Sequence, residues 1–141
     1  LSKINPLPQR AQYFNDISDL IYNTNLDLRT NINHILDNKN NRKRIPKSVR
    51  DSKNLTILFE GAIQLAKKKV QANYKVAVPQ YYNERIQLLL PICLVDPEIV
   101  DLALAVNKHD GYYTGHTCLT MDMAYNNARL IARPDSEWLK V

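Results

Sequence analysis

The spacing of apolar residues predicts one long helix near the middle of the chain. Residues 55–73 place seven apolar side chains on one face at helical spacing, as expected of an amphipathic helix: Leu55, Leu58, Phe59, Ala62, Ile63, Ala66 and Val70. Two polar residues interrupt this face. Lys69 can extend its amine to solvent along an aliphatic stem, and Asn73 lies at the helix end, where asparagine often caps.

Strand-like patterns follow this helix. Residues 75–78 form a short apolar stretch that Pro79 is expected to end. Residues 85–95 are strongly β-like but contain Pro91, which favours a sheet edge or a bulge at that point.

A hairpin is predicted from the next two apolar segments. Residues 101–107 alternate, with Leu102, Leu104 and Val106 on one face. The sequence His109-Asp110-Gly111 is typical of a tight turn, so residues 112–119 are expected to pair back as the partner strand.

The first third of the chain is less regular. Residues 1–18 contain two prolines and are expected to be extended. Residues 19–29 suit either two short strands or one irregular stretch. Residues 31–52, rich in asparagine and basic residues, predict a long loop with one helical turn at 32–36. The basic stretch 38–53 is expected to be a mobile loop. The whole chain is expected to be a single α+β domain over 1–141, a mostly antiparallel sheet with at least two packed helices.

A second helix is predicted over residues 121–132, capped by Thr120 and ended before Pro134. At 100° per residue its polar side chains form one narrow line: Asp122, Asn126, Arg129 and Arg133. Two interpretations stay open, a solvated face or a phosphate site held by the two guanidinium groups. Asn127 falls on the apolar arc and is expected to bond to a neighbouring loop rather than to a ligand.

The net charge of +5 is concentrated in one segment. Residues 39–53 carry seven basic side chains against one acid, Asp51. Such a segment suits sequence-independent contact with a nucleic-acid backbone, and the candidates are Arg42, Lys43, Arg44, Lys47 and Arg50. A solvated charged loop is the alternative interpretation.

Aromatic and amide side chains gather after the predicted strand at 75–78. Gln80, Tyr81 and Tyr82 follow Pro79, and the chain has eight tyrosines against two phenylalanines. Tyrosines at a strand end can stack on bases. They also commonly pack at the rim of a core with the hydroxyl reaching water or backbone.

Candidate catalytic and metal-binding residues are few. Asp122 and His116 are weak candidates for acid, base or metal-ligating roles, so the enzymatic status stays uncertain.

Cys93 and Cys118 form no metal-binding pattern and are expected to be buried thiols in a reducing, cytoplasmic compartment. No cofactor is expected, because glycine-rich phosphate-binding motifs are absent. No membrane association is expected either, because the longest apolar run, 88–95, is too short to span a bilayer.

Several segments together resemble a known family: 8–14 (PQRAQYF), 74–75 (YK), 77–82 (AVPQYY), 86–91 (IQLLLP), 101–104 (DLAL) and 119–139. The chain is similar to a family of uncharacterised bacterial domains, a domain of unknown function whose members are sometimes joined to LOTUS-type winged-helix or cold-shock modules. The resemblance implies an RNA-related setting and assigns no catalytic residue. It also implies that this chain is the C-terminal portion of the family domain, with a further segment before Leu1. The basic segment at 39–53 is longer than the family's usual connection.

The leading hypothesis is a binding module for RNA or a phosphorylated nucleotide. Phosphate would be held by Arg129 and Arg133, and Tyr81 or Tyr82 would stack on a base. Hydrogen bonds to the base would come from Asn126 and Gln80. The alternatives are an enzyme that processes a phosphoester or nucleotide, and a protein-interaction scaffold. The oligomeric state stays open.

Overall fold

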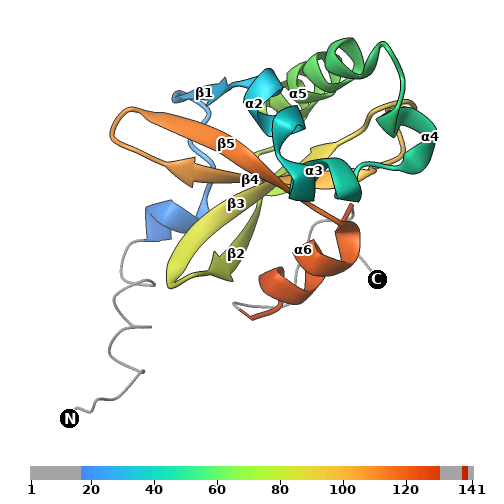
Figure 1. Cartoon of the computed structure of the whole chain (residues 1–141). Helices are drawn as coiled ribbons and strands as arrows, with labels where there is room; N and C mark the ends of the chain where they lie inside the picture. Colours follow the sequence, from blue (N-terminus) through green and yellow to red (C-terminus); the bar gives the residue numbers. More distant parts are fainter. Residues whose placement is uncertain (1–16, 131–137, 140–141) are drawn as a thin grey trace.

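The computed structural model describes residues 17–130 and 138–139 and shows an α+β fold built around a five-stranded sheet (Figure 1). The strands are β1 (Asp27–Thr30), β2 (Val78–Tyr82), β3 (Arg85–Ile92), β4 (Leu102–Lys108) and β5 (Tyr112–Leu119). Their order in the sheet is β1-β5-β4-β3-β2. Every neighbouring pair is antiparallel except β1 and β5, which are parallel. The predicted fold class is therefore confirmed.

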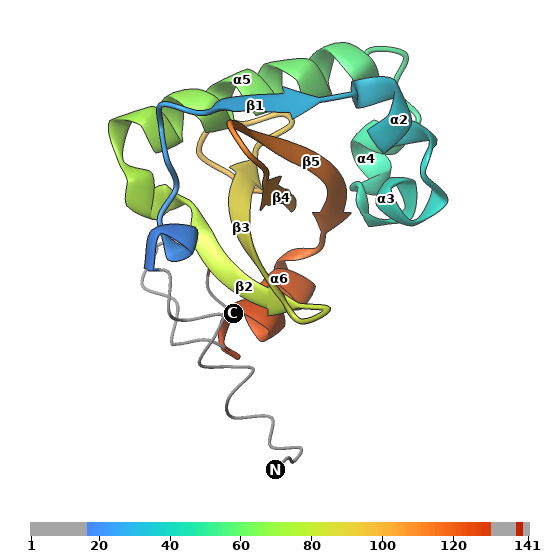
Figure 2. The ribbon, with the colours of Figure 1, turned by 90° about the vertical axis from the view of Figure 1, so that its left-hand side faces the viewer.

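Helices cover both faces of this sheet, as Figures 1 and 2 show for α5 and α6. The helices are α2 (Ile32–Asp37), α3 (Lys39–Arg44), α4 (Lys47–Arg50), α5 (Leu55–Ala72) and α6 (Met121–Ala128), with short 3-10 turns η1 (Ile17–Leu20) and η2 (Tyr74–Val76). Side-chain alternation along the strands gives two cores. Leu102, Leu104 and Val106 belong to the core under α5, and Ala103 and Ala105 belong to the core under α6.

The long helix and the hairpin agree with the sequence prediction. All of the predicted apolar face of α5 is buried apart from Leu58, which is half-buried and packs against the same core. Lys69 extends from this face and donates a hydrogen bond to the carbonyl of Pro97 at 2.9 Å. In the β4–β5 turn, Gly111 has a φ of 90°, a conformation that favours glycine.

The two prolines next to predicted strands behave differently. The expectation that Pro79 ends a strand at 75–78 is wrong, because residues 74–76 form η2 and Pro79 lies inside β2. A proline is tolerated there because β2 is an edge strand. Pro91 lies in β3 beyond Leu89, the last residue paired with β2, so it has a partner only in β4. This local edge is what the sequence predicted.

The predicted loop over 38–53 is instead occupied largely by α3 and α4. Asn38 is the N-cap of α3, and its side chain accepts a hydrogen bond from the backbone N–H of Asn41. Ile45 and Val49 are buried and hold the segment against the core under α5. Two apolar residues among many charges are too few to give a helical pattern, which explains the wrong expectation.

The C-terminal helix begins where predicted and ends earlier. The Thr120 side chain accepts from the backbone N–H of Met123 at 3.3 Å, as an N-cap does. The helix ends at Ala128 rather than at Ala132, and Arg129 is its C-cap. Arg133 lies outside the described residues.

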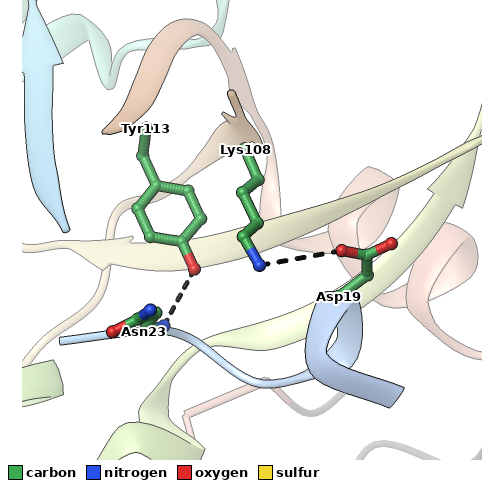
Figure 3. A network of polar contacts seen from close by, with 4 residues as sticks. All are labelled: Asp19, Asn23, Lys108 and Tyr113. Atoms are coloured by element: carbon green, nitrogen blue, oxygen red, sulfur yellow. Dashed lines mark hydrogen bonds and ion pairs between the residues drawn. The ribbon is translucent and has the colours of Figure 1, made fainter. Parts of the chain in front are cut away.

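Residues 17–26 comprise η1 and a short irregular segment, and they lie against β3, β4 and β5 (Figure 3). The Tyr22 and Tyr113 rings stack with centroids 4.5 Å apart. The Asn23 backbone N–H donates to the Tyr113 hydroxyl at 2.8 Å, and Lys108 and Asp19 form an ion pair at 3.9 Å. Burial raises the pKa of Tyr22 to about 12. β1 then continues from this stretch as the parallel edge strand.

Candidate functional site

A pocket of about 220 Å³ lies between α3, α6 and the sheet face that α6 only partly covers. Its lining is mostly polar and comes from α3 and the residue before it, from α6 and from four strands: Asn38, Asn40, Asn41, Arg44, Gln80, Tyr82, Gln87, Ala105, Thr117, Leu119, Met123 and Asn127. Six of these twelve residues carry carboxamide groups. A primary amide both donates and accepts hydrogen bonds, so the pocket suits a ligand with several polar atoms.

A row of three amides crosses the sheet, and two of them, Gln80 and Gln87, lie at the floor of the pocket. Gln80 and Gln87 are paired across β2 and β3. Gln80 Nε2 donates to Gln87 Oε1 at 2.6 Å, and Gln87 Nε2 donates to Asn107 Oδ1 of β4 at 3.0 Å. The three amides therefore all point in the same direction along the row.

One atom at the start of this row has no partner. Gln80 is only 1% exposed, and its Oε1 has no hydrogen-bond partner among the described residues. A buried acceptor without a partner costs on the order of 1–3 kcal/mol, and such atoms in native structures need an explanation. Because Gln80 lines the pocket, a hydrogen-bond donor on a bound ligand would satisfy it.

The α3 wall of the pocket also protects the edge of β5. β1 pairs with β5 only as far as Gly115, and beyond it no described strand lies along the outer edge of β5. There Asn41 accepts from the Cys118 N–H at 2.9 Å and donates to the His116 carbonyl at 2.8 Å. Arg44 donates to the Cys118 carbonyl at 2.8 Å. Side chains of α3 thus replace the missing strand.

Arg44 also gives the pocket its charge. It is half-buried and lines the pocket, and none of the described lining residues is an aspartate or glutamate. Tyr82 lies at the other side of the pocket and is 51% exposed, so part of its ring is accessible to a flat ligand. A cationic group, an accessible ring and several amides therefore surround one cavity.

The structure brings together some of the residues that the sequence suggested. Gln80 and Tyr82 line the pocket, whereas Tyr81 is half-buried and points to the opposite face of β2. Asn126 and Arg129 are exposed on α6 and are not among the lining residues. The ligand-binding roles assigned to them stay predictions.

The helix α6 contributes Asn127 instead. This residue, expected to brace a loop, is half-buried and lines the pocket with Met123. The sequence carried a usable signal for the floor, since Gln80 and Gln87 are amides close to strongly apolar strand segments. It carried none for Asn38, Asn40, Asn41 or Thr117, which depend on how α3 lies against β5.

Three of the five basic candidates donate hydrogen bonds to backbone carbonyls, two of them within residues 36–50 and one in β5. Arg42 donates to the carbonyls of Leu36 and Arg50, and Arg50 donates to those of Lys43 and Ile45. These carbonyls lie at or near the ends of α2, α3 and α4, where helical carbonyls lack intrahelical partners. Arg44 bonds to β5 as described above. Lys43 and Lys47 are exposed, and contact of any of the five with nucleic acid stays a prediction.

The weak catalytic candidates lie apart from the pocket lining. Asp122 is exposed in the first turn of α6, and His116 is exposed in β5, with its ring edge-on to His34 at 5.8 Å between centroids. Within the described ranges, no group of three or more histidine, cysteine or acidic residues is placed to hold a metal ion.

Both cysteines are free and buried, as predicted. Burial raises the pKa of the Cys118 thiol to about 12, against the opposing effect of Arg44. The cytoplasmic location inferred from the two thiols stays a prediction. None of the helices that the structure describes is long and apolar enough to cross a membrane.

A sequence model of the family described as "Domain of unknown function (DUF3825)" matches residues 1–138. The chain belongs to this family. The match covers the whole of the sheet, both helical layers and the pocket of the DUF3825 domain. No curated protein and no solved structure matches the chain.

Proposed function

We propose that this DUF3825 domain is a binding module for RNA or a phosphorylated nucleotide, and that the pocket holds one nucleotide unit. The observation that carries the proposal is the buried Gln80 Oε1, an acceptor at the floor of a polar cavity that has no hydrogen-bond partner in the described part of the chain. Nucleobases present donors and acceptors on one planar edge, and asparagine and glutamine amides pair with such edges. The amide-rich lining supports this choice of ligand.

Two further lining residues support the same ligand class. The accessible ring of Tyr82 offers a stacking surface, which every base can use. Arg44 would attract a phosphate, because a guanidinium has five N–H donors and the bond to Cys118 leaves others for an anion. Exposed Lys43 and Lys47 would contact neighbouring phosphates of a longer RNA. RNA is preferred because the sequence segments resemble a family whose members are sometimes joined to LOTUS-type or cold-shock modules.

Titration of the protein with a labelled single-stranded RNA heptamer, and with each of the four nucleoside monophosphates, tests this proposal. We expect Tyr82→Ala to weaken binding by about 10-fold or more through the lost stacking. Tyr74→Ala is the matched control, because Tyr74 is similarly exposed, at 46%, and does not line this pocket. Absence of wild-type binding at low salt, or equal losses in both variants, would contradict the proposal.

The same mixtures discriminate the two alternatives. An enzyme acting on phosphoesters would release product from RNA or nucleotide over hours, and Asp122→Asn would stop that release if Asp122 takes part. A protein-interaction scaffold would bind none of the five ligands. Chromatographic analysis of each mixture after incubation therefore separates binding, turnover and neither.

A further inference from the structure

The direction of the amide row has a consequence for the choice of ligand. Each amide has a donor end and an acceptor end, so the orientation of one member fixes that of the next. In the direction observed, Asn107 accepts from Gln87, Gln87 accepts from Gln80, and the acceptor of Gln80 is left for the pocket. If all three amide groups were rotated by 180°, the Gln80 amide would present its N–H donor to the pocket instead of its oxygen acceptor.

The residue at the far end of the row therefore influences a ligand that it does not touch. Asn107 lies on β4 and is not among the residues lining the pocket. It holds Gln87 through the 3.0 Å hydrogen bond, and Gln87 holds Gln80 through the 2.6 Å bond. Gln80 is almost fully buried, so its bond to Gln87 largely fixes how its amide is oriented.

We propose that the row Gln80–Gln87–Asn107 sets the hydrogen-bonding polarity of the pocket, and that the pocket selects a base presenting an exocyclic amino group to Gln80 Oε1. Adenine, cytosine and guanine carry such a group. Asn107 is then a positioning residue that acts through Gln87. This inference rests on the proposed function and narrows it to one ligand feature.

Two matched nucleotides test the selection. Purine riboside 5′-monophosphate is AMP without its amino group and keeps the ring, sugar and phosphate. We expect AMP to bind more tightly, by on the order of 10- to 100-fold, because the analogue leaves a buried acceptor unpaired. Equal affinities would overturn the inference and leave the proposed function intact, whereas no binding of any nucleotide or RNA would overturn the proposed function itself.

Variants of Asn107 test the row. Asn107→Asp keeps only an acceptor toward Gln87, so the observed direction is retained and the AMP preference should be at least that of the wild type. Asn107→Leu removes the bond and allows Gln80 and Gln87 to turn over together, so the preference should fall several-fold. If Asn107 had only a structural role, Asn107→Leu would weaken the binding of AMP and of the analogue equally. An unchanged ratio of the two affinities would therefore contradict the inference.

Gln80→Met tests the preference for AMP by removing the acceptor itself. Methionine has a similar length and no acceptor comparable to the amide oxygen, so the affinity ratio of the two nucleotides should approach one. A preserved preference for AMP in Gln80→Met would overturn the inference. Because this variant does not depend on how well the Asn107 variants fold, the inference stays testable in either case.

Discussion

At the scale of single residues, the buried polar side chains determine both the stability of the pocket and its chemistry. Asn41 is 2% exposed and bonds to Ile35, His116 and Cys118 through one amide. It joins α2 and α3 to the part of the β5 edge that lies beyond the pairing with β1. Its identity as a core residue could not be predicted, because asparagine is common in exposed segments and its neighbours in sequence are all polar or charged.

Replacement of Asn41 by alanine should destabilise the protein by about 3 kcal/mol, because three backbone groups, two of them in buried bonds, lose their partner. Urea denaturation followed by circular dichroism would measure the change. Asn40→Ala is the control, since Asn40 is exposed in the same helix and should alter stability by less than about 0.5 kcal/mol. Equal effects of the two substitutions would show that the Asn41 hydrogen bonds do not stabilise the fold.

At the scale of elements, patterns of apolar residues predicted the long helix and the strands with many buried side chains. The face of α5 and the β4–β5 hairpin follow directly from spacing and turn chemistry. The parallel strand β1 could not be predicted from residue spacing, because its four residues contain only one buried side chain, Leu28. The short helices α3 and α4 depend on tertiary contacts and on arginine bonds to their terminal carbonyls, and local sequence gives little indication of either.

Loss of the Arg50 guanidinium should loosen α3 and α4 without unfolding the sheet. In Arg50→Met the carbonyls of Lys43 and Ile45 lose their donor, so amide hydrogen exchange in this segment should become faster by about 5-fold or more. Lys47→Met removes a charge from the same helix and should leave exchange unchanged, because Lys47 is exposed. Similar exchange rates in both variants would argue against the structural role of Arg50.

At the scale of the whole molecule, the pocket arises because the two faces of the sheet are covered unequally. The core under α5 is continuous, whereas α6 covers the apolar part of the other face and leaves amide side chains beside it. Residues from α3 and α6 both contact the strands at this pocket, although the two helices are more than 70 positions apart in the chain. The sequence identified Gln80 and Tyr82 as candidates, but the residues that join them depend on packing between distant elements.

The central claim is that this pocket, rather than the exposed polar line of α6 or the basic surface, binds a nucleotide. The most direct test is titration of the ¹⁵N-labelled protein with AMP while backbone amide chemical shifts are followed. We predict the largest changes around the pocket, at Asn41, Gln80, Thr117 and Asn127. Changes confined to Asp122, Asn126 and Arg129, or to the exposed lysines of α3 and α4, would contradict the account, as would a spectrum that AMP leaves unchanged.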